Sequence, residues 1–231
     1  MIFENSQETI ELTPEMFVNY DNNYRIGMKI SGGADSAIVA YMLAKFAKEE
    51  LPELVIYPVT GVTPTKPYQE IYAKRVIKRI TELTGYDNWG EHFVGTARAD
   101  TYVSDQQQVL KHAYLTARLA THFYGITANP TQEEAPELYA WRDKWGSPCI
   151  GIEERQRMSS KKPWFALKAP LANVDKKGVA EHYINQGLMD TLYPVTRSCE
   201  AFIDEPAYDI EKHCEECYFC FERFWGFNRY S

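Results

Sequence analysis

Apolar residues recur along this chain with two different periods, one typical of buried strands and the other typical of amphipathic helices. Short apolar runs predict strands over residues 26–30, 54–59, 92–95, 126–129 and 164–168. Apolar residues at helical spacing predict helices over 36–48, 67–84, 105–123 and 176–186, and around 136–144. Because strands and helices alternate, we expect an α/β, Rossmann-like fold, with a parallel sheet covered by helices on both faces.

The turn between the first strand and the first helix is rich in glycine and serine. It consists of Ser31, Gly32, Gly33, Ala34, Asp35 and Ser36. Adjacent glycines let the backbone approach an anion, and the free N–H groups and dipole at a helix start favour negative charge. The serine hydroxyls add donors, and Asp35 suits a Mg²⁺ ion bound to phosphate. This pattern favours a pyrophosphate site over the alternative, an ordinary glycine turn that caps a helix.

Cysteine is concentrated near the end of the chain. Four of the five cysteines are Cys199, Cys214, Cys217 and Cys220. Two consecutive C-x2-C spacings, in a chain that shows no export signal, favour a Zn²⁺ ion held by four thiolates. His213 could replace one thiolate, and a redox-active C-x-x-C pair is the competing interpretation. Cys149 is remote in sequence and is expected to be a small buried apolar residue.

Charge and hydropathy narrow the classes of partner. With 32 acidic and 25 basic residues the net charge is −7, so no overall field attracts a polyanion, and we expect no nucleic-acid partner. The densest basic cluster is Arg155, Arg157, Lys161 and Lys162. We interpret it as a solvated loop, with a phosphate-contacting lid as the alternative. No apolar stretch approaches the ~18 residues of a membrane helix, and the first residues are acidic, so we expect a cytoplasmic protein.

A second candidate motif follows the fifth predicted strand. Residues 170–176 open a helix, and this turn places Lys176 to direct its ammonium toward the carboxyl edge of the sheet. Asn129 and Pro130 end the fourth predicted strand and are expected at the same edge, where open α/β folds bind ligands. A lysine near a helix start is usually just a solvent-exposed residue, so a functional role for Lys176 is supported only by the motifs around it.

Two parts of the chain resemble one enzyme family. Residues 31–36 resemble the SGGxDS loop of the N-type ATP pyrophosphatases, the PP-loop superfamily, and lack the Gly-Lys-Ser ending of a Walker A loop. The later part resembles the 7-cyano-7-deazaguanine synthases, which carry a P-L-x4-K turn, then Ser-Cys, then a C-x2-C-x2-C run near an Arg. The matching residues are Pro170, Leu171, Lys176, Ser198, Cys199, Cys214, Cys217, Cys220 and Arg223.

The resemblance implies an adenine nucleotide α hydrolase-like fold, with residues 1–195 as the ATP pyrophosphatase domain and 196–231 as a small zinc-binding segment. It implies ATP, Mg²⁺ and Zn²⁺ as cofactors. The resemblance implies that residues 31–36 and Lys176 bind the phosphates, and that Asp35 and Lys176 are catalytic residues. It also implies that the four clustered cysteines bind zinc.

The reaction implied is adenylation of a carboxylate, with release of pyrophosphate, followed by attack of ammonia. The acceptor would be the deazapurine 7-carboxy-7-deazaguanine, converted to its amide or to 7-cyano-7-deazaguanine in queuosine biosynthesis. Partners are then this small molecule and ammonia, and a homodimer is a compatible assembly. Residues 59–64 and the acidic stretch between Cys199 and Cys214 depart from the family pattern. Two alternatives stay open: a PP-loop enzyme that thiolates tRNA, and a noncatalytic zinc-bearing interaction module.

Overall fold

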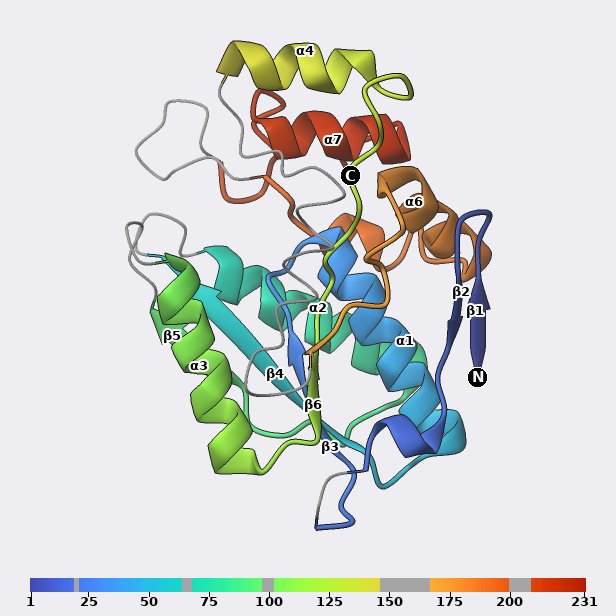
Figure 1. Ribbon diagram of the computed structural model, residues 1–231, viewed down its shortest axis with the longest axis vertical. Helices are drawn as coiled ribbons and strands as arrows, with labels where there is room; N and C mark the ends of the chain where they lie inside the picture. Colours follow the sequence, from blue (N-terminus) through green and yellow to red (C-terminus); the bar gives the residue numbers. More distant parts are fainter. Residues whose placement is uncertain (19–20, 64–67, 97–101, 146–166, 200–208) are drawn as a thin grey trace.

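A parallel β-sheet forms the centre of the molecule in the computed structural model, which describes residues 1–18, 21–63, 68–96, 102–145, 167–199 and 209–231. Within these residues the sheet has five strands in the order β5-β4-β3-β6-β7 (Figure 1). The strands are β3 (Arg25–Lys29), β4 (Val55–Val62), β5 (Phe93–Thr96), β6 (Thr121–Phe123) and β7 (Leu167–Lys168). All their pairings are parallel, which confirms the predicted α/β, Rossmann-like fold.

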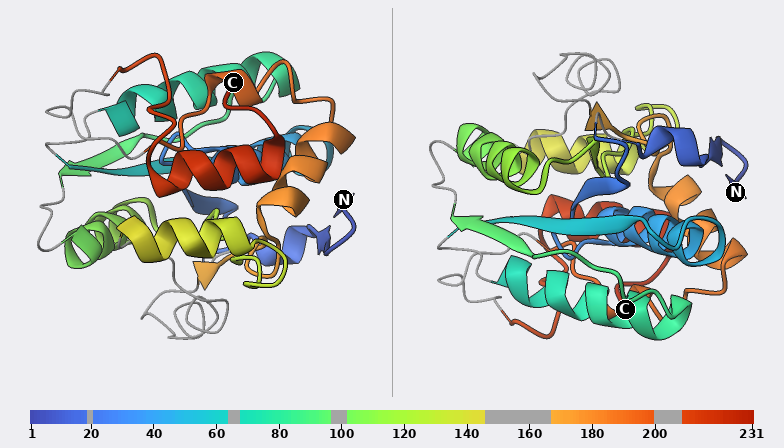
Figure 2. Two further views of the ribbon diagram at one scale, coloured as in Figure 1. Left: turned by 90° about the horizontal axis from the view of Figure 1, so that it is seen from above. Right: turned by 90° about the horizontal axis from the view of Figure 1, so that it is seen from below.

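Helices cover both faces of the sheet. Helices α1 (Ala34–Glu50) and α2 (Tyr68–Thr84) pack against each other, and α2 lies across the sheet from α3 (Tyr102–Ala117) (Figure 2). Helix α1 buries residues around most of its circumference, because it lies between the sheet and other helices, whereas α2 buries one stripe that includes Tyr72, Val76 and Ile80. These are the helices that the apolar spacing predicts.

Within the described residues, three further helices gather beyond the carboxyl end of the sheet (Figure 1). They are α4 (Pro136–Trp145), α6 (Lys176–Asn185) and α7 (Tyr218–Phe227). Helix α6 contacts both α1 and α7, and α4 packs on the outer side of α7. Phe227 of α7 joins the main hydrophobic core, together with Tyr183 of α6 and the buried residues of α1. The C-terminal segment therefore packs against the carboxyl end of the sheet.

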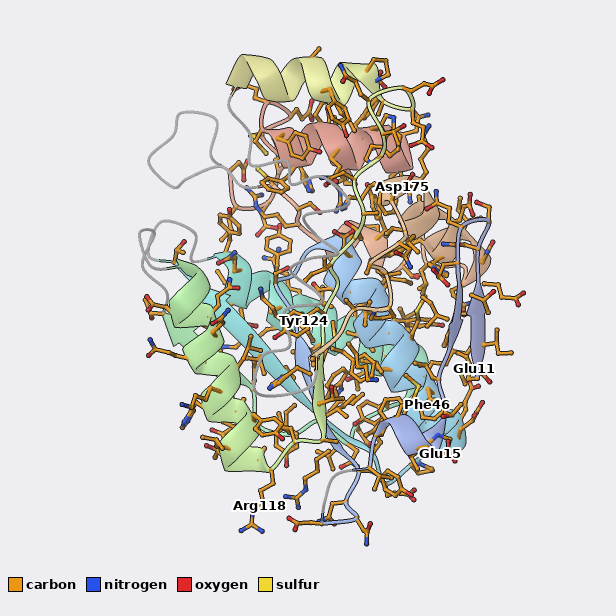
Figure 3. The ribbon with its side chains drawn as sticks, in the orientation of Figure 1. Glu11, Glu15, Phe46, Arg118, Tyr124 and Asp175 are labelled. Atoms are coloured by element: carbon orange, nitrogen blue, oxygen red, sulfur yellow. The ribbon has the colours of Figure 1, made fainter. Side chains whose placement is uncertain are left out.

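The chain begins with a hairpin that the sequence pattern does not predict. Strands β1 (Ile2–Glu4) and β2 (Thr9–Glu11) pair antiparallel, and the short 3-10 helix η1 (Pro14–Met16) follows. Asn5 in the hairpin donates a hydrogen bond to the Gly178 carbonyl of α6 at 2.9 Å. After the hairpin, Phe17 packs against Phe46 of α1, which Figure 3 labels, with ring centroids 5.0 Å apart. The hairpin therefore adds a wall to the core beside α1 and α6.

One predicted boundary is wrong. We expect a helix through residue 123 and a strand over 126–129, but α3 ends at Ala117 and β6 covers Thr121–Phe123. Arg118, labelled at the end of α3 in Figure 3, has a left-handed φ of 52°, which stops the helix. Ala120 then donates to the Arg25 carbonyl at 2.7 Å and starts the new strand. Phe123 fits helical spacing by coincidence, because it faces the core from β6, and Ala120 packs against the core just before that strand.

Several predictions fall on parts of the chain outside the described residues. Cys149, the basic cluster at 155–162 and the start of the fifth predicted strand lie there, although β7 bears out the end of that strand. Helix α4 matches the helical stretch expected around 136–144. Across the part of the chain that the structure describes, no helix is both long and apolar enough to cross a membrane.

Candidate functional site

The loop after β3 has the local geometry of an anion site. Gly32 adopts a left-handed φ of 85°, and Gly33 is the N-cap of α1 without any side-chain cap. The first bond within the helix runs from the Ala37 N–H to the Gly33 carbonyl at 3.1 Å. The N–H groups of the first turn therefore have no acceptor within the helix and carry the positive end of its dipole. The hydroxyl oxygens of Ser31 and Ser36 lie 3.3 Å apart beside them.

A cavity of about 310 Å³ opens at this loop. The chain leaves β3 toward β4 on one side, while β6 flanks β3 on the other, so the loops after β3 and β6 diverge here. Open α/β sheets bind ligands at such a switch point. The lining residues are Ser31, Gly33, Asp35, Tyr68, Gln69, Gly125, Ile126, Thr127, Lys176, Arg197, Ser198, Cys199, Phe219 and Glu222.

The predicted site residues fall into two groups. Ser31, Gly33, Asp35 and Lys176 line the cavity, and Ser36 lines a second cavity that shares part of the same wall. The two other loop residues line neither: Ala34 is buried in the core, and Gly32 faces α2. The sequence pattern also places Asn129 at this edge, but Gly125, Ile126 and Thr127 occupy it instead, because β6 ends earlier than expected.

Asp35 and Lys176 meet although they are 141 positions apart. The Lys176 ammonium donates to both Asp35 carboxylate oxygens, at 2.7 and 2.6 Å, and lies 3.3 Å from Glu222 Oε2. The side chains of Lys176 and Glu222 are each only 4% exposed. One buried ammonium thus faces two carboxylates, and Glu222 Oε1 has no hydrogen-bond partner among the described residues. The local charge suits a cation, and carboxylate oxygens are the ligands that Mg²⁺ prefers.

Local structure explains how Lys176 reaches this position. Asp175, labelled in Figure 3, caps α6 by accepting from the Lys177 and Gly178 N–H groups at 2.8 and 3.0 Å. The cap fixes Lys176 as the first residue of the helix. Gly226 of α7 allows close contact, since a Cβ there would lie 2.4 Å from Lys176 Cγ. Helix α7 therefore holds the lysine stem against the cavity.

The C-terminal segment also holds the loop in place. The Arg197 N–H donates to the Gly32 carbonyl at 2.8 Å, and the Tyr183 hydroxyl donates to the Ala34 carbonyl at 2.8 Å. Arg223, fully buried, donates to Thr196 Oγ1 and Ser198 Oγ at 2.9 and 3.2 Å. These bonds connect α7, the segment before Cys199 and the loop into one unit. Burial lowers the pKa of Arg223, and its neighbours Tyr193 and Tyr183 oppose that shift.

The two glycines of the loop should respond differently to substitution. A Cβ on Gly32 would lie 2.4 Å from Tyr72 Cβ on a left-handed backbone, whereas one on Gly33 would meet its nearest atom, Ser31 Oγ, at an ordinary 3.5 Å. We therefore expect Gly32→Ala to lower the unfolding free energy by about 1–3 kcal/mol. Gly33→Ala should cost less than about 1 kcal/mol, the difference between glycine and alanine at an N-cap, and should weaken the ATP binding that the sequence predicts, because its methyl group would lie at the cavity. Urea unfolding and calorimetric titration with an ATP analogue measure both effects, and equal loss of stability in the two variants would contradict this assignment.

The four clustered cysteines converge in space. Their sulfur atoms all lie within 4.8 Å of one another, and the Cys214 and Cys220 sulfurs are 3.8 Å apart. Hydrogen bonding with Cys199, and next with Cys214, raises the pKa of the Cys217 thiol above its ordinary value. Four thiolates so close together need a cation, so this group could hold a metal ion. His213, the alternative ligand, lies outside the group, and its Nε2 accepts from the Ser198 N–H at 3.4 Å.

Sequence reasoning missed several residues of the cavity. Glu222 is the most consequential, followed by Arg197, whose guanidinium stacks 4.7 Å from the Tyr68 ring. Both are nearly fully buried charged residues, with 3% and 4% exposure. The sequence could have indicated both, because each lies beside residues of a recognised motif. Arg197 precedes Ser198-Cys199, and Glu222 lies between Cys220 and Arg223. Gln69 also lines the cavity, on a helix that sequence analysis treats only as an amphipathic cover.

No protein-family model matches the chain, and no curated protein sequence matches it. Among solved structures, the U34-tRNA thiolase NcsA from Methanococcus maripaludis with its [4Fe-4S] cluster aligns with a TM-score of 0.45 at 15% sequence identity. The alignment covers 74% of this chain and 61% of that chain, so this protein spans about three fifths of the thiolase's length.

Proposed function

We propose that this protein is a PP-loop ATP pyrophosphatase that adenylates an acceptor and releases pyrophosphate. The observation that carries the proposal is the bidentate contact between Asp35 and Lys176 beside the uncapped start of α1. A Walker A loop supplies its own lysine, whereas here the ammonium comes from a distant helix. That arrangement supports cleavage of ATP between the α and β phosphates.

The chain's own residues would act mainly by positioning and by charge. The N–H groups of the first turn of α1 and the hydroxyls of Ser31 and Ser36 would bind the β and γ phosphates. Lys176 would stabilise the charge that develops on departing pyrophosphate, as the acceptor oxygen attacks the α phosphorus in line. Mg²⁺, held by Asp35, would neutralise further phosphate charge when it is bound. Glu222 would retain Lys176 at the cavity when Asp35 turns to the metal.

We further propose that the acceptor is a carboxylate, with 7-carboxy-7-deazaguanine as the best candidate. Attack by the carboxylate forms an acyl-adenylate, and ammonia then displaces AMP to give the amide. Clustering of four of the five cysteines leaves Cys149 as the one cysteine outside that group. Together with the net charge of −7, this supports a small-molecule acceptor over the sulfur transfer to tRNA that the alternative requires.

Zinc is the metal that we propose for the cysteine group. A Zn–S bond of about 2.3 Å in a tetrahedron separates neighbouring sulfurs by roughly 3.8 Å, as Cys214 and Cys220 are separated here. An iron–sulfur cluster of four irons spreads its ligands over four metal atoms and needs a wider group. Four thiolates leave no open position for water, so this ion would have a structural role and would stabilise α7 against the cavity.

Product analysis tests the proposed function directly. We expect ATP, Mg²⁺, 7-carboxy-7-deazaguanine and ammonium to yield AMP, pyrophosphate and an amide or nitrile product of changed mass. Release of ADP and phosphate alone would overturn the proposal. Pyrophosphate release that depends on tRNA, and not on the carboxylate, would replace the acceptor by a nucleic acid. An absence of ATP binding would favour the noncatalytic interaction module.

A further inference from the structure

A second cavity, of about 210 Å³, adjoins the first at the glycine loop. The two share the wall formed by Ser31, Gly33, Asp35, Gln69, Gly125 and Ile126. The second cavity extends toward the α3 face of the sheet, where its own lining residues include Lys29, Gln106 and Tyr124. Its volume is below the ~300–1,000 Å³ of typical ligand pockets, so it suits one end of a ligand rather than a whole nucleotide.

Lys29 is an unusual residue for this position. It lies near the end of β3, where side chains alternate between the two faces, and its neighbours Met28 and Ile30 are fully buried apolar residues. The Lys29 ammonium donates to Gln106 Oε1 at 2.5 Å and lies 5.8 Å from the centre of the Tyr124 ring. Within the described residues it forms no ion pair with a carboxylate. Asp35 lines the same cavity, but Lys176 already contacts both of its carboxylate oxygens.

The surroundings of Lys29 are built to keep this ammonium in the cavity. Gly61 on β4 makes room for the partner amide, because a Cβ there would lie 2.9 Å from Gln106 Cγ. Gly61 belongs to residues 59–64, the segment that departs from the family pattern. Burial lowers the pKa of Lys29 to about 8, so the side chain is still mostly protonated at neutral pH. Within the described residues, this half-buried cation contacts a neutral amide and an aromatic ring and has no carboxylate partner.

We propose that Lys29 and Gln106 form the acceptor subsite and bind an anionic group of the acceptor beside the ATP loop. The inference rests on the proposed function and names the chemistry that recognises the acceptor: a carboxylate that pairs with the ammonium and accepts a hydrogen bond from the amide. The shared wall places that carboxylate next to the loop that would hold ATP. Lys29 is a binding residue in this account, whereas Lys176 handles the departing pyrophosphate.

Binding measurements can show whether Lys29 binds the carboxylate of the acceptor or only stabilises the fold. We would titrate wild-type protein, Lys29→Met and Gln106→Glu with 7-carboxy-7-deazaguanine and with its uncharged 7-carboxamide, each in the presence of α,β-methylene-ATP and Mg²⁺. We expect wild-type protein to prefer the carboxylate. Lys29→Met should lose about tenfold or more of the carboxylate affinity, as expected for a charged hydrogen bond, and little of the amide affinity. Gln106→Glu should have the same effect, because its carboxylate would occupy the ammonium.

Controls make the result decisive. Lys78→Met, at an exposed position of α2, should change neither affinity. Lys29→Gln keeps a polar side chain of similar length and replaces Lys29→Met should that variant unfold. The inference would be overturned if wild-type protein bound the two compounds equally or bound neither. It would also be overturned if a separate titration showed that Lys29→Met loses affinity for α,β-methylene-ATP alone. A protein that releases no AMP and pyrophosphate overturns the proposed function instead, and the comparison of carboxylate with amide still decides the role of Lys29.

Discussion

Replacing Lys176 with methionine is expected to reduce pyrophosphate release by about 10²–10³-fold, the usual effect of removing one donor from a developing negative charge. The same change should lower the unfolding free energy by about 3–5 kcal/mol, because it leaves the Asp35 and Glu222 carboxylates facing each other without their shared cation. Steady-state kinetics and urea unfolding at neutral pH measure the two effects. Lys177→Met, at the adjacent exposed lysine, serves as the matched control and should cost less than about 1 kcal/mol.

A second substitution separates the effect of Lys176 on stability from its effect on pyrophosphate release. Glu222→Gln removes one of the two carboxylates that Lys176→Met leaves without a cation. Adding Glu222→Gln should restore part of the stability and none of the pyrophosphate release. Recovery of pyrophosphate release together with stability would mean that Lys176 acts only by stabilising the fold. A Lys176→Met variant as stable as wild-type protein at neutral pH would contradict the predicted cost of leaving the two carboxylates without a cation.

The main features of the fold are predictable from sequence because they rest on local periodicity. The strand before Ser31, the amphipathic stripe of α2 and the glycine loop each follow from residues close together in the chain. The end of α3 was not predictable in this way. A left-handed Arg118 stops the helix, and the pairing of β6 with β3 decides that residues 121–123 form a strand. Both effects depend on tertiary contacts that override helical spacing.

Prediction of the candidate site is limited in a similar way. Sequence motifs identify Asp35, Lys176 and the cysteines as chemically distinctive, but they do not show that Lys176 touches both Asp35 and Glu222. Glu222 reads as an ordinary charge on a helix, and only the packing of α7 brings it to the cavity. In the sequence, Lys29 is only a charged residue in an apolar strand. The folded structure shows that it lines the second cavity. Contacts between distant segments cannot be obtained from local patterns.

Loss of the proposed zinc ion is expected to have the second large effect, on stability. Cys217→Ser removes one of the four clustered sulfurs and should lower bound zinc well below one ion per chain. Zinc contributes about 10–16 kcal/mol in small structural sites, and loss of only ~4 kcal/mol here would lower the melting temperature by about 8–16 °C. Metal analysis and calorimetry on the same sample measure both changes. His213→Gln is the control and should keep its zinc, since His213 lies outside the sulfur group.

Loss of the proposed zinc ion should also disturb the glycine loop, because residues 197–199 both contact this loop and include one of the clustered cysteines. Cys199 lines the cavity two residues after Arg197, whose N–H holds the Gly32 carbonyl, and Cys217 is the N-cap of the helix that carries Glu222. Cys217→Ser should therefore weaken binding of an ATP analogue while the core around α1 stays folded, which hydrogen exchange can resolve by segment. A variant that is fully metallated and equally stable would reject the structural role. Protein that contains iron and absorbs visible light would reject zinc.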